Sequence, residues 1–315
     1  MSEQRIPVVA VLGPTAGGKT ALAVTLAKRF GGEVVSCDSM QIYKELSVST
    51  ARPTPAETDG VPHHLMGFLS IESSYSVADY VTDAGRVIEE INRRGRRAFL
   101  CGGTGQYADA LLDGMRFEGE AGSAEKKAEL AAFYSENGLA ALTARLRKAD
   151  PDAAGQIDVK NPKRVLRALE IVEALGTPLR DYHQRNLSSQ SPYRSLKIVI
   201  DFKDRNNLYE RINLRVEKML SDGLVKEARE MYNRNIIATA SQAIGCKELT
   251  AYFEGEKSLE ECADRIRRAT RRYAKRQQTW FRRERDAHFV YADEEDVCAR
   301  SIALCEQFYG EEVPQ

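Results

Sequence analysis

Short apolar runs alternate with amphipathic stretches along the first hundred residues. The runs at Val8 to Leu12, Glu33 to Cys37 and Arg97 to Cys101 predict buried strands, because they are short and bounded by turn residues. Ala21 to Phe30 and Val77 to Ile91 instead repeat apolar residues every three or four positions, which predicts helices. This alternation predicts an α/β fold in which helices flank a parallel sheet.

The pattern changes from Arg116 to Ser191, where the sequence contains no strand-like runs. Ala, Glu, Lys and Leu recur there at helical spacing, and Asp150-Pro151 and Asn161-Pro162 are turn and helix-start signals. We therefore expect an all-helical insertion domain at 116–191 and a core made of 1–115 and 192–315. A chain of 315 residues is long enough for a large core and a smaller domain.

After the insertion the chain is expected to return to the sheet and then to become mainly helical. Leu196 to Phe202 and His288 to Tyr291 predict strands, whereas the tail from Glu295 shows no distinctive pattern. Asn207 to Leu220 predicts an amphipathic helix with Arg215 at the edge of its apolar stripe. That stripe consists of Leu208, Ile212, Val216 and Met219.

A long helix is predicted to start at the capping box Ser258-x-x-Glu261. Its expected buried face consists of Leu259, Cys262, Ile266, Ala269, Tyr273, Gln277 and Trp280. Its other face carries Arg265, Arg268, Arg271, Arg272, Lys275, Arg276 and Arg282. This density of positive charge exceeds what solubility requires and predicts a phosphate backbone as the partner, bound in a salt-dependent way.

The composition excludes several classes of protein. No run of about 18 apolar residues and no apolar N-terminal segment is present, so we expect a cytoplasmic protein without a membrane span. The six cysteines are scattered without C-x-x-C pairs, which supports neither a disulfide framework nor a structural zinc. Charge is balanced at 46 basic and 46 acidic residues, so only its distribution is informative.

The segment Gly13-Pro14-Thr15-Ala16-Gly17-Gly18-Lys19-Thr20 joins the first predicted strand to the first predicted helix. It fits G-x-x-x-x-G-K-[ST] at every fixed position, the pattern of a phosphate-binding P-loop. Its glycines let several backbone N–H groups point into one concavity at the positive end of the helix. Lys19 adds a full charge, and Thr20 offers its hydroxyl to Mg²⁺. The motif leaves open whether the phosphates belong to a nucleotide or to another pyrophosphate ester.

Polar residues follow the second and third predicted strands. Asp38-Ser39-Met40-Gln41 and Gly102-Gly103-Thr104-Gly105 should lie at the carboxyl edge of the sheet, beside the P-loop. Asp38 is then either a group of the site or the N-cap of the next turn. The glycine turn either offers N–H groups and the Thr104 hydroxyl to the ligand or is only a tight connection.

The segment from Thr50 to His64 is polar and contains prolines, and we expect a loop over the site there. A metal site at His63-His64 is not favoured, because adjacent residues on an extended chain point to opposite faces and catalytic zinc needs a third protein ligand. In the insertion, the basic stripe of Lys163, Arg164 and Arg167 is either a solvated surface or a nucleic-acid contact.

Together these motifs resemble those of the bacterial tRNA dimethylallyltransferases, in the family's order, from residue 10 to about 283. Beside the P-loop, the matching motifs are Asp38-Ser39-Met40-Gln41-Ile42-Tyr43, Thr50-Ala51-Arg52-Pro53, Pro62-His63-His64-Leu65, Gly102-Gly103-Thr104-Gly105, Arg164-x-x-Arg167-Ala168-Leu169-Glu170, Ala243-Ile244-Gly245 and Tyr273-Ala274-Lys275-Arg276-Gln277-x-Thr279-Trp280. The departures are Gly17 where Ser is frequent, Cys101 where Val is usual, Gln106 where Leu is usual and Cys246 where Tyr is usual.

The resemblance implies a P-loop NTPase-like core and transfer of a dimethylallyl group from dimethylallyl diphosphate to N6 of the adenosine 3′ of the anticodon. The loop amides, Lys19, Mg²⁺ near Thr20, Thr104 and Arg215 would stabilise the departing diphosphate, and Asp38 would take the proton of the amine. The implied contacts to the tRNA anticodon stem-loop are Asp38, Ser39, Met40, Gln41, Thr104, Lys126, Lys163, Arg164, Val165, Leu166, Arg167, Gln242, Ala243, Ile244, Gly245, Cys246, Lys247, Lys275, Arg276, Gln277, Trp280 and Arg282. We expect a monomer.

Three other functions are weighed against this one. A P-loop small-molecule kinase would use ATP, and the first 40 residues alone do not exclude it. An adenosine-nucleotide isopentenyltransferase would have no use for the basic helix, and neither would the kinase. A non-catalytic nucleic-acid-binding protein would not need intact Lys19, Thr20 and Asp38.

Overall fold

The structure, a computed structural model, describes residues 5–115, 117, 124–186, 190–234, 236 and 239–310. The chain divides into two compact units, Met1–Leu112 with Pro192–Gln315 as the core unit and Asp113–Ser191 as the helical unit. Arg116, where the sequence predicts the insertion to begin, lies outside the described residues. None of the described helices is both long enough and apolar enough to span a membrane.

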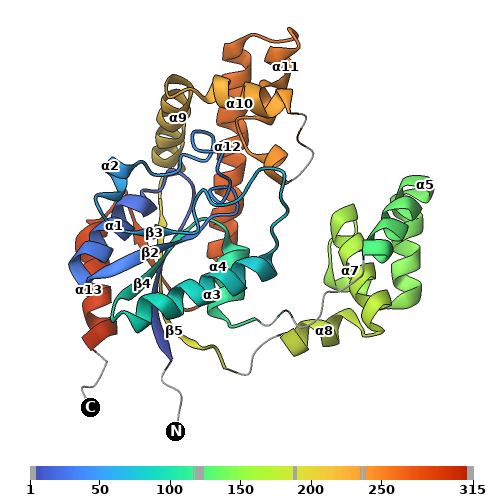
Figure 1. The fold of residues 1–315 in the computed structure, drawn as a ribbon, viewed down its shortest axis with the longest axis horizontal. Helices are drawn as coiled ribbons and strands as arrows, with labels where there is room; N and C mark the ends of the chain where they lie inside the picture. Colours follow the sequence, from blue (N-terminus) through green and yellow to red (C-terminus); the bar gives the residue numbers. More distant parts are fainter. Residues whose placement is uncertain are drawn as a thin grey trace. The chain divides into compact units, whose positions relative to one another are not determined.

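The core unit is built on a six-stranded sheet in the order β3-β2-β4-β1-β5-β6 (Figure 1). Its strands are β1 (Ile6–Leu12), β2 (Gly32–Cys37), β3 (His63–His64), β4 (Arg97–Gly102), β5 (Tyr193–Asp201) and β6 (Ala287–Tyr291). Each neighbouring pair runs parallel, which confirms the predicted sheet and brings the carboxyl ends of all six strands to one edge. The loops that follow β1, β2 and β4 therefore lie at the same edge of the sheet.

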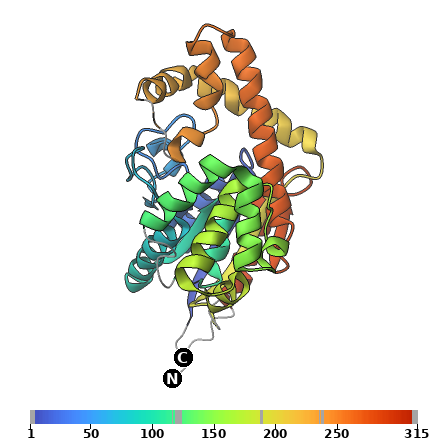
Figure 2. The ribbon, with the colours of Figure 1, turned by 90° about the vertical axis from the view of Figure 1, so that its right-hand side faces the viewer.

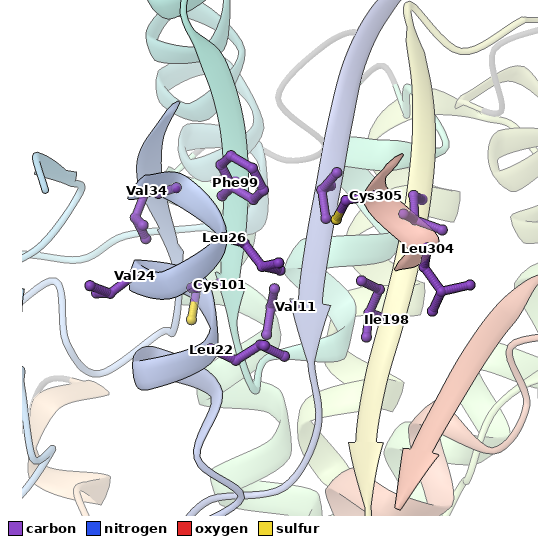
Figure 3. Close-up of a cluster of buried hydrophobic side chains, with 14 of the residues drawn as sticks. Val11, Leu22, Val24, Leu26, Val34, Phe99, Cys101, Ile198, Leu304 and Cys305 are labelled. Atoms are coloured by element: carbon purple, nitrogen blue, oxygen red, sulfur yellow. The ribbon is translucent and has the colours of Figure 1, made fainter. Parts of the chain in front are cut away.

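Helices cover both faces of the sheet. On one face α1 (Lys19–Phe30) and α13 (Val297–Gly310) pack on the strands, with Leu22, Leu26, Leu304 and Cys305 buried among sheet residues (Figure 3). On the other face lie α3 (Val77–Arg93) and α4 (Gly105–Leu112). The expectation that the tail from Glu295 has no distinctive structure is wrong. α13 has its buried residues at helical spacing, but they include Ser301 and Cys305, which weakens the hydrophobic pattern.

A third group of helices packs on the loops at the carboxyl edge of the sheet. α9 (Arg205–Ser221), α10 (Leu224–Asn233), α11 (Thr250–Phe253) and α12 (Leu259–Phe281) belong to it, with the 3-10 turns η1 (Thr239–Gln242) and η2 (Lys247–Leu249). They share an apolar cluster with the segment from Met40 to Tyr75, so this layer holds the loops that follow β2. The predicted inward stripe of α9 is confirmed.

The long helix α12, drawn in orange in Figure 2, begins at the predicted capping box. Its buried face differs in part from the prediction. In its second half the buried residues are Thr270, Ala274, Gln277 and Phe281, whereas Trp280 is 37% exposed. Cys262, Ile266 and Gln277 are buried as predicted. Tyr273 and Trp280, which the sequence pattern favoured, are not fully buried, and Tyr273 lies at the edge of the stripe.

The predicted loop between Thr50 and His64 contains two short elements. Thr54 caps the single turn α2 (Pro55–Thr58), and β3 adds His63 and His64 to the edge of the sheet. His64 Nε2 lies 2.7 Å from Glu33 Oε2, which fastens this short strand to β2. The predicted loop is therefore confirmed at 50–54, whereas 55–58 and 63–64 form short elements that the sequence did not predict.

The helical unit contains α5 (Ala124–Ala149), α6 (Ala153–Gln156), α7 (Pro162–Leu175) and α8 (Leu179–Asn186). Gly138 has non-helical backbone angles, so α5 consists of two helical stretches. Asn161 caps α7 through the backbone N–H groups of Lys163 and Arg164, which confirms the predicted start. The hydrophobic core of the helical unit includes Leu130, Leu142, Leu146, Val165, Leu169 and Leu179.

Candidate functional site

The P-loop connects β1 to α1 at the carboxyl edge of the sheet. Gly13 has φ 139° and faces the carbonyl of Ile200, so a side chain there would be strained and would overlap that oxygen. Gly18 precedes the helix at φ 91°. The loop can therefore turn its amides toward the N-terminus of α1, where a phosphate group is favoured.

Lys19 lies in this loop with its ammonium group folded onto the chain. Its Nζ donates a hydrogen bond of 2.8 Å to the carbonyl of Pro14. The pKa of Lys19 is lowered to about 8, mainly by burial; the nearby Arg215 guanidinium contributes to this lowering, and Asp38 opposes it. The group is thus a desolvated cation that lacks a carboxylate partner in direct contact among the described residues, and a phosphate would supply the missing charge.

Gln277 of α12 connects the P-loop to the second glycine turn. Its side-chain oxygen accepts a hydrogen bond of 2.8 Å from the Thr15 N–H, and its amide nitrogen donates one of 2.9 Å to the Gly103 carbonyl. A Cβ at Gly103 would overlap that amide group. The glycine is therefore required by the close approach of α12, a reason that the sequence alone did not reveal.

Two arginines of α9 reach the P-loop side of the site. Arg211 donates a hydrogen bond of 2.8 Å from Nε to the Ala16 carbonyl. Arg215 donates one of 3.0 Å to the Thr50 carbonyl, and burial lowers its pKa. The sequence predicted Arg215 as a site residue but missed Arg211, which lies one helical turn earlier and was signalled only by that spacing.

A cavity of about 630 Å³, here called the phosphate-loop cavity, is lined by these groups. Lys19, Arg211, Arg215 and Lys218 contribute four positive charges to its wall against the two carboxylates of Asp38 and Glu57, which makes it cationic. Cys101 also lines it, and burial raises the pKa of this thiol to about 11, so it adds no charge near neutral pH. The volume and the charge suit a small diphosphate ester.

A second cavity of about 320 Å³, here called the α12 cavity, opens beside α12. Its walls include Lys247, Tyr273 and Arg276, together with Met40, Met219 and Ile244. Thr15, Asp38 and Arg215 line both this cavity and the phosphate-loop cavity. These three residues therefore form the boundary at which ligands in the two cavities would meet.

Asp38 lies at that boundary and follows β2. Its Oδ1 accepts hydrogen bonds from the N–H groups of Met40 at 2.9 Å and Gln41 at 3.2 Å. This is the capping role weighed in the sequence analysis. Oδ2 makes no hydrogen bond among the described residues and is left for a ligand. Asp38 thus combines the two roles that the sequence presented as alternatives.

Thr104 and Tyr273 form a hydroxyl cluster next to Asp38. The Thr104 hydroxyl accepts a hydrogen bond of 3.0 Å from the Ser39 N–H and lies 3.3 Å from the Ser39 hydroxyl. Burial raises the pKa of Tyr273, an effect that the nearby Thr104 side chain partly opposes. The phenol therefore stays protonated beside the carboxylate. The sequence analysis placed Tyr273 on a buried face and missed it as a site residue.

Comparison with known proteins matches this arrangement to one family. The family described as IPP transferase matches residues 41–284, well over half of the chain. The chain belongs to the IPP transferase family. It is 43% identical over 290 residues to the tRNA dimethylallyltransferase of Halalkalibacterium halodurans, covering 92% of this chain and 91% of that relative.

Solved structures agree with the assignment to the IPP transferase family. The full-length tRNA isopentenylpyrophosphate transferase of Bacillus halodurans is 40% identical with a TM-score of 0.69, covering 97% of this chain and 99% of that one. A eukaryotic dimethylallyltransferase acting on tRNA is 26% identical with a TM-score of 0.84, covering 97% and 80%. The P-loop-like parallel α/β fold predicted from the sequence is confirmed.

Some of the residues that the resemblance assigns to tRNA binding line the α12 cavity in this IPP transferase, and others do not. Those lining the α12 cavity are Asp38, Ser39, Met40, Gln242, Ala243, Ile244, Lys247 and Arg276. Others have protein partners: Arg282 bonds to Asp201, and the Trp280 indole donates to Asp109 at 2.8 Å. Gln277 is 5% exposed, and its amide already bridges two loops. We therefore regard Gln277 as a residue that holds the site together.

In the helical unit, the assigned residues separate by burial. Lys163, Arg164 and Arg167 line a cavity of about 370 Å³ that also includes His183. Val165 is fully buried in the core of this unit, so a contact to RNA at this position would have to involve its backbone. Lys126 pairs with Glu129 and Glu173.

Proposed function

We propose that this chain transfers a dimethylallyl group from dimethylallyl diphosphate to N6 of the adenosine 3′-adjacent to the anticodon in tRNA, releasing diphosphate. Relatives that are 40% or more identical to this chain are named tRNA dimethylallyltransferase, and the matching family is described as IPP transferase. The observation that carries the proposal is that Asp38 and Arg215 line both the phosphate-loop cavity and the α12 cavity. Donor and acceptor can thus enter from different sides and react at a shared boundary.

The donor side stabilises the leaving group. The adenine amine is a weak nucleophile, so the C1–O bond must be strongly polarised as diphosphate departs. Lys19, the loop amides and Arg215 supply fixed positive charge at that oxygen end, and each such contact is worth on the order of 3 kcal/mol of transition-state stabilisation. Arg211 adds a further cation to the same cavity.

The acceptor side removes a proton. As the bond between N6 and C1 forms and the C1–O bond breaks, the proton on N6 passes to Oδ2 of Asp38. The two backbone N–H groups on Oδ1 keep the carboxylate in orientation. A general base of this kind contributes roughly a hundredfold to ten-thousandfold in rate.

The adenine must leave its stack to reach Asp38. In an anticodon loop this costs roughly a few kcal/mol, less than in a duplex. The α12 cavity offers Met40, Met219 and Ile244 as apolar contacts for a base, and Lys247 and Arg276 for the neighbouring phosphates. The exposed basic face of α12 and Lys163 to Arg167 would add affinity that depends on salt.

Magnesium fits the donor set of this site. Thr20 places a hydroxyl on the phosphate-loop cavity, and Mg²⁺ is commonly held by such hard oxygen atoms together with substrate phosphates. When bound, the ion would neutralise charge on the leaving diphosphate. Mg²⁺, a monomeric state and a cytoplasmic location remain predictions.

The test is incubation of the protein with labelled dimethylallyl diphosphate, Mg²⁺ and total tRNA, followed by nucleoside analysis. We expect N6-dimethylallyladenosine at the position 3′ of the anticodon, formed on the order of a hundredfold to a thousandfold more slowly by the Lys19→Ala variant. A parallel reaction with ATP and small acceptors examines the kinase alternative. Phosphate transfer from ATP without label in tRNA would refute the proposal, and label in free adenosine nucleotides but not in tRNA would favour the adenosine-nucleotide isopentenyltransferase.

A further inference from the structure

A glutamate occupies a buried position on α10. Glu227 belongs to the inward stripe of this helix with Leu224, Ala228 and Met231, and only 9% of it is exposed. A buried carboxylate is costly unless it is paired with hydrogen-bond donors. Its partners therefore show why an acidic residue stands in an apolar stripe.

Those partners are consecutive backbone amides of one turn. Glu227 Oε2 accepts hydrogen bonds from the N–H groups of Ser47 at 2.8 Å and Val48 at 2.7 Å, and Oε1 accepts one from Ser49 at 2.8 Å. The Ser47 hydroxyl lies 3.3 Å from Oε2. Successive amides that converge on one anion form a nest, and hydrogen bonds to an ionised acceptor are the stronger kind. The turn is thus tied to a helix about 180 residues away.

The same turn holds Arg215. The Thr50 carbonyl, directly after this nest, accepts hydrogen bonds from Arg215 at 3.0 Å and from the Gln41 side chain at 3.3 Å. The next residue, Ala51, has φ 44°, a conformation that a non-glycine residue adopts only when its surroundings impose it. Ser49 and Thr50 also line the α12 cavity. The position of Arg215 therefore depends on how firmly the turn is held.

We propose that Glu227 is a positioning residue for the transfer reaction. Its carboxylate fixes the turn of residues 47–50, the Thr50 carbonyl fixes the Arg215 guanidinium, and Arg215 faces the departing diphosphate. The inference rests on the proposed function, because Arg215 has this role only if a diphosphate leaves there. Glu227 itself lines neither the phosphate-loop cavity nor the α12 cavity.

The test variant is Glu227→Gln, which keeps the shape but replaces one acceptor by an amide that opposes the N–H donors of the turn. We expect kcat to fall on the order of tenfold to hundredfold, as for a small misplacement of a reacting group. The dissociation constant for tRNA should change by less than about twofold, since such a change is within the scatter of independent sites. Glu227→Asp, which keeps the charge, should recover part of the loss in kcat.

A double-mutant cycle with Arg215→Ala separates positioning from a general loss of stability. If Glu227 acts through Arg215, Glu227→Gln should lower kcat by less than about twofold in the Arg215→Ala background. An equally large loss in both backgrounds would overturn the proposal. The cycle requires a wild-type protein that labels tRNA. If the wild-type protein leaves tRNA unlabelled, the proposed function is refuted.

Two control variants lie on the same helix. Met231→Ala removes a buried apolar side chain of α10 and leaves the hydrogen bonds from Glu227 to the turn in place, so it should lower the unfolding free energy but leave kcat nearly unchanged. Glu230→Gln removes an exposed charge and should change neither. A loss of kcat in Met231→Ala as large as that in Glu227→Gln would show that the helix, and not its carboxylate, matters.

Discussion

The desolvated Lys19 gives the binding of diphosphate a defined pH dependence. Its pKa is lowered from an ordinary 10.5 to about 8 by burial in the loop. Near pH 9 only about a tenth of the free protein therefore carries the ammonium group. A bound diphosphate raises the pKa again, because a neighbouring opposite charge favours the protonated form. Ligand binding above pH 8 must then be coupled to uptake of a proton.

The measurement is calorimetry with dimethylallyl thiolodiphosphate, which does not react readily and keeps its full charge over this range. We expect a constant affinity up to about pH 7.5, followed by a weakening of about tenfold per pH unit above pH 8. Titrations in buffers with different ionisation enthalpies should show uptake of nearly one proton at pH 9. In Lys19→Met both the pH dependence and the proton uptake should disappear. Wild-type affinity that does not change between pH 7 and pH 10 would refute the reasoning.

The same shift also predicts how stability depends on pH. Between pH 8 and 10.5 the unfolded chain holds a proton on Lys19 that the folded chain lacks, so the cost of burying Lys19 is largest below pH 8 and falls as the pH rises. At 1.36 kcal/mol per unit, the upper bound of this cost is about 3 kcal/mol. Lys19→Met should therefore be more stable than wild type to urea at pH 7, by up to that amount. The advantage should vanish near pH 10.5, and an advantage that persists there would contradict the assigned cause.

Three further predictions concern other parts of the site. Asp38→Asn retains an acceptor for the two turn amides and should lose roughly a hundredfold to ten-thousandfold in turnover with unchanged tRNA binding. Asp38→Ala should show the same loss and should also be less stable on urea unfolding. Turnover near wild type in either variant would refute the assignment of Asp38 as the general base. Gly103→Ala should destabilise the protein by about 1–3 kcal/mol through overlap with Gln277, and in a Gln277→Ala background it should cost much less; equal costs would show that the contact does not matter. Arg272→Gln, on the exposed face of α12, should reduce the slope of log affinity for tRNA against log salt by about one, whereas Arg267→Gln, whose side chain is already paired with Glu260 and Asp264, should leave it unchanged.

The sheet, the P-loop and most helix starts could be predicted because they depend on local signals. Strand runs, glycine turns and the caps at Ser76, Asn161 and Ser258 each act over a few residues. Asp38 could be placed in the site because parallel strands share one carboxyl edge. The family resemblance then gave the functions of residues whose local pattern was ambiguous.

What the sequence did not reveal depends on contacts between distant residues. The hydrogen bonds of Gln277 to Thr15 and Gly103 and the pairing of Glu227 with Ser47–Ser49 join positions far apart in the chain. Glu227 had one local signal, an acidic residue at a position of helical spacing with Leu224 and Met231. α13 was missed because its buried stripe includes serine and cysteine, and packing on the sheet decides its burial.

The helix α12 contributes to two functions of this enzyme. α12 grips the P-loop with Gln277 on its inner side and presents Arg272 and Arg276 on its outer side, within about one turn. Substitutions that shift or rotate α12 to suit a different RNA would also weaken the contacts by which it holds the P-loop around the leaving group. RNA specificity and transfer rate therefore cannot evolve independently through changes that move α12. Changes of specificity should accumulate instead at exposed positions that leave the packing of α12 unchanged.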